Sequence, residues 1–177
     1  MTDLSHNFAL VALGSNLGAR EATLTRALIA LDDLSEAPLR CSSWWCSAPE
    51  LMADDAGEFI NGVVELQTTL SAWQLLQSLQ TIEQQAGRPE AHGFNASRVL
   101  DLDIICFGEA VIDMPGLVIP HPRAWQRLFV LVPLAELCPG LILPGQPESV
   151  ETLIDRATGE PVTLLLAAPV LPPRLPL

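Results

Sequence analysis

Two acidic residues alternate with large apolar residues in the segment 99–107. Leu102 separates Asp101 from Asp103, and apolar residues occupy positions 104–107. A period of two predicts a β-strand, in which both carboxylates lie on one face while Leu102 and Ile104 lie on the other. The pattern therefore predicts a strand with one apolar face and two adjacent carboxylates on the opposite face.

The remaining chain has strand and helix patterns in a definite order. Apolar runs predict strands at 8–13, 40–47 and 59–68, and apolar periodicity with capping residues predicts helices at 20–34, 71–87 and 123–137. With the strand at 99–107, this order is that of a ferredoxin-like α+β fold, an antiparallel sheet with helices packed on it. We expect a single domain, 1–177, with a core at about 8–144 and a C-terminal extension at 145–177.

The chain is strongly acidic, with a net charge of -12. This charge disfavours nucleic acid and anionic membranes as partners, so we expect small-molecule substrates and a monomer or weak homodimer. All nine basic residues are arginines, and a bound polyanion would need magnesium and a few placed arginines to balance its charge. The polar start of the chain and its lack of a run of about 20 apolar residues predict a cytoplasmic protein.

The aspartate pair is the first candidate for chemistry. Two carboxylates at this spacing could hold magnesium ions and bridge them to phosphates. The alternative is a strand end with solvated aspartates. Arg98 lies three residues before the pair, and most other positive charge of the central and later chain comes from Arg88, His121, Arg123 and Arg127. This grouping favours a polyanion that is held by metal and guanidinium together.

Three segments together resemble one family, the 6-hydroxymethyl-7,8-dihydropterin pyrophosphokinases of folate biosynthesis. These segments are 12–18, ALGSNLG; 98–108, RVLDLDIICFG; and 119–134, which begins IPHPR and includes RLF and PL. The resemblance runs from about Phe8 to Pro144. Ser42-Ser43 and 59–61 match segments that line the pterin pocket of the family. The segment 14–16 lacks the glycine pattern of a phosphate loop, so we interpret it as a turn that supports the pocket.

The resemblance implies transfer of pyrophosphate from ATP to the pterin hydroxymethyl group, with two magnesium ions on Asp101 and Asp103. The implied catalytic residues are Arg98, Asp101, Asp103, His121 and Arg127. The implied contacts to the cosubstrate ATP come from Gln80, Glu83, Arg88, Arg98, Ile104, His121 and Arg127. The implied contacts to the pterin come from Ser47, Ala48, Phe59, Asn61 and Phe129.

The chain departs from the family pattern at several positions. Glu90 and Gly116 stand where the family has basic residues, and Asn95 stands in a loop that usually carries a tryptophan. Each change removes a contact to ATP or a group that closes over the pterin. An alternative is therefore a non-catalytic or altered-specificity pterin-binding paralogue with weakened ATP binding.

Overall fold

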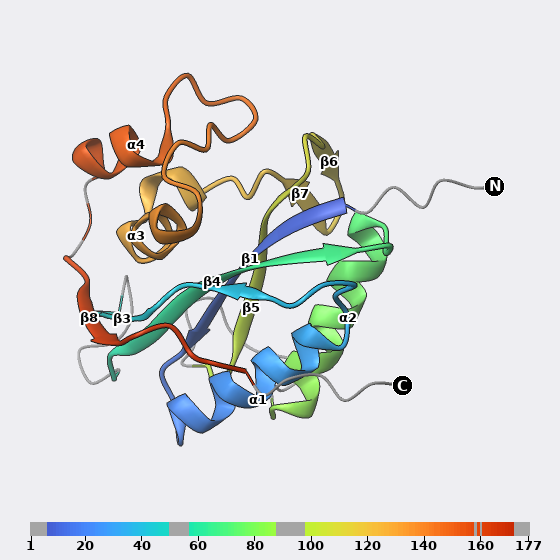
Figure 1. Cartoon of the computed structure of the whole chain (residues 1–177), viewed down its shortest axis with the longest axis vertical. Coiled ribbons are helices and arrows are strands. Elements are labelled where there is room, and N and C mark those ends of the chain that lie inside the picture. The colour runs from blue at the N-terminus through green and yellow to red at the C-terminus, as the bar shows by residue number, and fades with distance from the viewer. Residues whose placement is uncertain (1–6, 50–56, 88–97, 158, 160, 172–177) are drawn as a thin grey trace.

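A six-stranded antiparallel sheet forms the centre of the molecule (Figure 1). The structure is a computed structural model that describes residues 7–49, 57–87, 98–157, 159 and 161–171. The strands are β1 (Asn7–Ser15), β2 (Arg40–Cys41), β3 (Trp44–Ser47), β4 (Phe59–Thr68), β5 (Asp101–Phe107) and β8 (Thr163–Leu166). Their order is β5-β1-β4-β3-β8, and β2 also pairs with β4. The acidic strand β5 is therefore an edge strand beside β1.

Two helices cover one face of the sheet, as the ferredoxin-like prediction requires. They are α1 (Arg20–Asp32) and α2 (Ala72–Gln85), and their apolar residues pack against the buried residues of β1, β4 and β5. Ser71 caps α2 as predicted, because its side chain accepts the Gln74 N–H at 3.3 Å while the Gln74 side chain accepts the Ser71 N–H at 2.9 Å. The prediction of an antiparallel sheet with packed helices is confirmed.

The opposite face carries a second helical layer that the sequence patterns only partly indicated. It consists of α3 (Leu128–Leu137) and α4 (Val150–Arg156), which pack on Val63, Ile105 and Cys106 of the sheet. The prediction of a helix from 123 is wrong at its start, because 124–126 form the 3-10 turn η1 (Ala124–Gln126) and Arg127 is extended. Figure 1 shows α3 and α4 on the side of the sheet away from α1 and α2.

Three further differences from the predicted elements have local causes. The segment 40–47 forms two strands, since the Ser42 side chain accepts the Val63 N–H at 2.9 Å, where a regular ladder would use a backbone carbonyl. A hairpin, β6 (Ile112–Met114) and β7 (Leu117–Ile119), turns at Gly116 with φ +87°. The C-terminal extension contributes α4 and the edge strand β8, which pairs with β3.

The four cysteines are free thiols, and Cys106 is buried while Cys41, Cys46 and Cys138 are half-buried. Burial raises the pKa of both Cys41 and Cys106 to about 11, so these thiols are protonated at neutral pH. Among the described residues, no helix is both long and apolar enough to cross a membrane.

Candidate active site

A row of four residues runs across the sheet on the face that α3 partly covers. In the strand register Asp101 of β5 lies opposite Gly14 of β1, Gly14 lies opposite Asn61 of β4, and Asn61 lies opposite Trp45 of β3. Directly opposed residues of antiparallel strands have their side chains on the same face. The candidate metal ligands and the candidate pterin residues therefore share one face of the sheet.

The predicted alternation along β5 is confirmed. Leu102 and Ile104 are 4% and 5% exposed and belong to the core beneath α1 and α2, whereas Asp101 and Asp103 are half-buried on the opposite face. Arg98 forms an ion pair with Asp101, and both side chains remain about one quarter exposed to solvent. The strand thus presents two accessible carboxylates with a guanidinium beside one of them.

The segment 14–16, which was predicted to be a turn that supports the pocket, contacts Arg98 and Val99. The Asn16 side chain accepts the Arg98 N–H at 2.7 Å, and the Arg98 carbonyl accepts the Asn16 N–H at 3.1 Å. The Ser15 hydroxyl donates to the Val99 carbonyl at 2.6 Å. Gly14 and Ser15 belong to β1 itself, so the prediction that the strand ends at 13 is wrong by two residues.

The outer edge of β5 meets α2. The buried Glu83 carboxylate accepts the Leu102 N–H at 2.9 Å, which fixes the edge strand to the helix. Because backbone groups alternate along an antiparallel strand, the Ile104 N–H faces this same outer edge. Gln80 lies exposed about one turn before Glu83. Arg88, the remaining ATP candidate of this region, lies outside the described residues, as do Glu90 and Asn95.

His121 lies along the same edge and is a neutral hydrogen-bond donor. Its backbone N–H donates to the Ile105 carbonyl at 2.9 Å, and its ring atom Nδ1 accepts the Arg123 backbone N–H at 3.2 Å. Burial, followed by the charges of Arg127 and Arg123, lowers the pKa of His121 to about 4, and Asp101 acts weakly in the opposite direction. A neutral imidazole whose Nδ1 accepts a hydrogen bond carries its proton on Nε2.

Arg127 and Phe129 come from the junction of η1 with α3. The Arg127 guanidinium carbon lies 5.3 Å from the centre of the Phe129 ring, a cation–π arrangement. Phe129 is half-buried and packs at the edge of the cluster formed by α3 and the sheet. The start of α3 therefore brings a cation and an aromatic ring to the same face as the aspartate pair.

The candidate pterin residues of β3 and β4 form a contiguous group. The Asn61 amide donates to the Ser47 hydroxyl at 2.9 Å, and both residues are at most 5% exposed. Phe59 lies directly opposite Ser47 in the register, and the exposed Ala48 follows at the end of β3. These contacts place Ser47, Phe59 and Asn61 side by side, and Ala48 follows Ser47 in the chain.

Gly14, which the sequence assigned only to a supporting turn, lies beside the candidate pterin residues. A Cβ atom at Gly14 would lie 3.4 Å from Asn61 Oδ1 and 3.7 Å from a Phe59 ring carbon. The glycine therefore keeps open the space in front of the amide and the ring. The available signal was a glycine in a strand pattern, which often marks a close approach of a ligand or of another chain segment.

The match of Ser42-Ser43 to the pterin pocket requires a correction. A Cβ atom at Gly62 would lie 3.3 Å from the Ser42 hydroxyl and 2.6 Å from the ring of Trp44, which belongs to the core beneath α1 and α2. Ser42 therefore faces away from Asn61, because this core lies on the other side of the sheet. Trp44 and Trp45 point to opposite faces, as a strand requires.

A carboxylate pair that lies beside arginines and a neutral histidine donor is typical of an enzyme that transfers a phosphoryl-type group. Residues 10–139 match the family described as 7,8-dihydro-6-hydroxymethylpterin-pyrophosphokinase (HPPK). The chain is 38% identical over 133 residues to the 2-amino-4-hydroxy-6-hydroxymethyldihydropteridine pyrophosphokinase of Bacillus subtilis, covering 75% of this chain and 79% of that protein. It is 42% identical over 134 residues to the Pseudomonas aeruginosa protein of the same name, and this match covers 76% of this chain and 82% of that protein.

The crystal structure of wild-type Plasmodium falciparum HPPK-DHPS with pteroate has a similar fold, with a TM-score of 0.69 at 14% identity. That similarity covers 86% of this chain and 42% of the other, so the chain spans less than half the length of that protein. The chain belongs to the 7,8-dihydro-6-hydroxymethylpterin-pyrophosphokinase family.

Proposed function

We propose that this chain transfers the pyrophosphoryl group of ATP to the hydroxymethyl group of 6-hydroxymethyl-7,8-dihydropterin. The acceptor oxygen forms a bond to the β-phosphorus, the bond from that phosphorus to the oxygen of AMP breaks, and the hydroxyl proton passes to solvent. The observation that carries the proposal is the row from Asp101 through Gly14 to Asn61. This row supports the proposal because Asp101, a carboxylate that could hold nucleotide-bound magnesium, shares a sheet face with Asn61, an amide that could bind the acceptor.

The residues at β5 fit two magnesium ions that bridge to phosphates. Asp101 and Asp103 offer accessible hard oxygen ligands on one face. Within the described part of the chain, no three His, Cys, Asp or Glu residues are grouped so that they could hold a metal ion. Magnesium that is bound here would complete its shell with water and phosphate oxygens, and it would align the phosphates and neutralise charge on them.

The cations around the pair supply the remaining contacts to the phosphates. Arg98 already lies on Asp101, so it is placed to contact a phosphate that is bridged to that carboxylate. His121 offers its Nε2–H without a competing proton equilibrium near neutral pH, since its pKa is lowered to about 4. Arg127 adds a second guanidinium at the start of α3. Together these donors stabilise negative charge as AMP leaves.

The edge of β5 suits the adenine of ATP. An edge strand presents unpaired backbone donors and acceptors, and Ile104 has its N–H on that side. Glu83 holds the neighbouring Leu102 N–H and so fixes the backbone position of the edge. Gln80 lies on the same helix and can add a side-chain contact. This arrangement supports the proposed ATP contacts of Gln80, Glu83 and Ile104.

The acceptor side combines hydrogen bonds with aromatic rings. Asn61 carries both donor and acceptor groups for the edge of the pterin, and Ser47 orients its amide. Phe59 and Phe129 offer faces for the flat bicycle. Ala48 lies at the exposed end of β3, where it can contact the bound ring.

The test is AMP release from ATP in the presence of magnesium and 6-hydroxymethyl-7,8-dihydropterin. We expect turnover that disappears with a chelator and returns with added magnesium. Asp103→Asn should remove turnover without loss of the fold, which circular dichroism would check. Absence of AMP at high concentrations of the wild-type chain would refute the proposed reaction.

A further inference from the structure

Glu136, near the end of α3, connects this helix to β3. One carboxylate oxygen accepts the Trp45 indole N–H at 2.6 Å, and the other accepts the Ser43 backbone N–H at 2.7 Å. Both are short, charge-assisted hydrogen bonds. The two oxygens of one side chain thus bind a strand that lies more than ninety residues away in the sequence.

The two elements that Glu136 connects each carry part of the proposed acceptor pocket. Phe129 lies about two turns before Glu136 on α3, and residues seven apart in a helix lie on the same face. Trp45 lies directly opposite Asn61 in the strand register, and Ser47, two residues further along β3, binds the Asn61 amide. The width of the pocket between Phe129 and Asn61 therefore depends on how α3 sits on β3.

We propose that Glu136 is a positioning residue that sets this width by holding α3 against β3 through Trp45 and Ser43. This inference rests on the proposed function. Glu136 itself is exposed, and in the structure its contacts are with the strand rather than with a site residue. Its effect would act through the placement of Phe129 and of the Trp45 ring, which neighbours Asn61.

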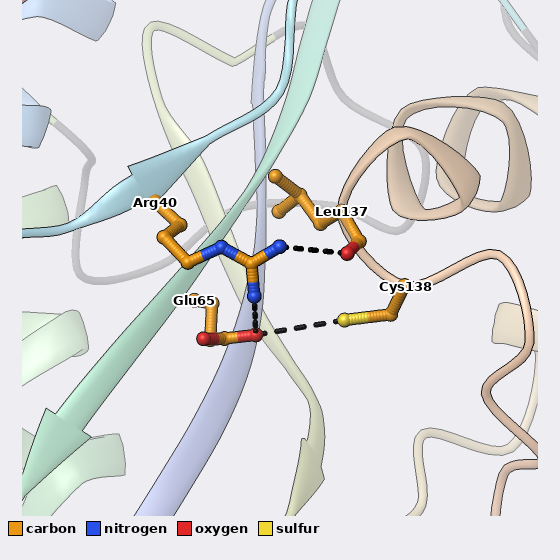
Figure 2. Close-up of polar contacts among 4 residues, drawn as sticks. All are labelled: Arg40, Glu65, Leu137 and Cys138. Carbon is orange, nitrogen blue, oxygen red and sulfur yellow. Dashed lines mark hydrogen bonds and ion pairs between the residues drawn. The ribbon is translucent and has the colours of Figure 1, made fainter.

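A second connection at the same end of α3 provides an internal comparison. Arg40 donates to the Leu137 carbonyl at 2.8 Å and to the Glu65 carboxylate at 2.8 Å, and the Cys138 thiol donates to Glu65 at 3.5 Å (Figure 2). Arg40 and Glu65 pair across β2 and β4, so this connection docks the helix end without contacting β3. It connects the same helix end to β2 and to Glu65 of β4, and not to β3.

The experiment compares Glu136→Gln and Trp45→Phe with two controls. Gln keeps one acceptor and places an amide N–H₂ against the other donor, whereas Phe keeps a ring and removes the indole N–H. Arg40→Gln removes the second connection. Glu148→Gln is the second control. It weakens an exposed ion pair in which Arg156 of α4 donates to the Glu148 carboxylate at 2.7 Å.

We expect Glu136→Gln and Trp45→Phe each to raise KM for the pterin, and its Kd in calorimetry with a non-hydrolysable ATP analogue, by about ten-fold. KM for ATP should stay within about two-fold of the wild-type value. The effect of the double variant should be smaller than the sum of the two single effects, because Glu136 and Trp45 share one hydrogen bond. Arg40→Gln and Glu148→Gln should shift the urea midpoint only, and their KM for the pterin should be unchanged.

An unchanged pterin KM in Glu136→Gln would overturn the inference. A rise of pterin KM in Arg40→Gln as large as that in Glu136→Gln would also overturn it, because it would show that any contact that docks the end of α3 has the same effect. A wild-type chain that releases no AMP would instead refute the proposed reaction. In that case the calorimetric Kd for the pterin decides the inference by itself. A ten-fold weaker Kd in Glu136→Gln supports it, and an equal Kd overturns it.

Discussion

Gly14 and Gly62 are strand glycines whose substitution by alanine should have opposite consequences. Gly14 lies on the α3 face, where a Cβ atom would be 3.4 Å from Asn61 Oδ1 and 3.7 Å from Phe59. Gly62 is directed toward the core, where the same atom would be 2.6 Å from a Trp44 ring carbon. The first set of distances is near ordinary contact and the second is far inside it.

Gly14→Ala should therefore leave the fold intact and weaken acceptor binding. Substitution of glycine by alanine at a compatible position gains about 0.4–1 kcal/mol from the unfolded state, and the 3.4 Å contact offsets part of this gain. The free energy of unfolding should thus be unchanged or rise by less than about 1 kcal/mol. The methyl group occupies space in front of Asn61, and overpacking of about 1–3 kcal/mol corresponds to a pterin Kd weaker by about 5- to 150-fold.

Gly62→Ala should instead lower the free energy of unfolding by about 1–3 kcal/mol, because the ring of Trp44, only 5% exposed, has to move. Urea unfolding measures the two stabilities, and calorimetry with an ATP analogue measures the pterin Kd. Two results would refute the reasoning. One is a loss of stability in Gly14→Ala as large as that in Gly62→Ala, and the other is a pterin Kd unaffected by the Gly14 methyl group.

Three further outcomes follow from the same structure. Asp101→Asn should lower kcat, measured by AMP release, by at least about 100-fold. The free energy of unfolding, measured with urea, should change by less than about 1 kcal/mol. A collapsed fold would show that this half-buried carboxylate is structural. The folded chain keeps His121 neutral down to about pH 4, whereas the unfolded chain binds a proton at this residue near pH 6.5. The free energy of unfolding should therefore fall as the pH decreases through this window, by about 1 kcal/mol after allowance for the partial exposure of the ring. His121→Gln should remove this pH-dependent loss, which urea midpoints at pH 7 and pH 5 would measure. Asn16→Ala removes the side-chain oxygen that accepts the Arg98 backbone N–H at 2.7 Å. It should therefore lower the free energy of unfolding by about 1–3 kcal/mol and also lower kcat. An unchanged kcat would show that the placement of Arg98 does not depend on this side chain.

The sequence predicted the parts of the fold that depend on local periodicity. The alternation along β5 and the capping box at Ser71 are properties of neighbouring residues, and the structure confirms both. The break between β2 and β3 was not predictable in this way, because it depends on the Ser42 hydroxyl replacing a backbone acceptor for Val63 on another strand. The predicted helix began at 123, whereas α3 begins at Leu128. Residues 124–126 form the 3-10 turn η1, and helical spacing of apolar residues does not distinguish such a turn from the first turn of an α-helix.

The candidate site was predictable by residue type more than by position in space. Asp101 and Asn61 were predicted from their chemistry and from the resemblance, and Ser47 was predicted from the resemblance alone. The strand register brings the three residues to one face. Gly14 was assigned only to a supporting turn, because the space in front of Asn61 and Phe59 that it leaves open is not visible in any sequence pattern. Glu136 was not found either, since an exposed glutamate near the end of a helix is unremarkable until its two partners on β3 are known.

The acidic composition of the chain and its proposed polyanionic substrate are compatible because the electrostatic potential at the site is set locally. At His121 the effects of Arg127 and Arg123 on the pKa each exceed the opposing effect of Asp101. The two arginines therefore act on this imidazole more strongly than Asp101 does, although the whole chain carries -12. Charges that lie more than about 8 Å apart are largely screened at physiological ionic strength, so distant carboxylates contribute little there. Arg123 and Arg127 thus oppose, at this point of the candidate site, the acidic charge of the rest of the chain.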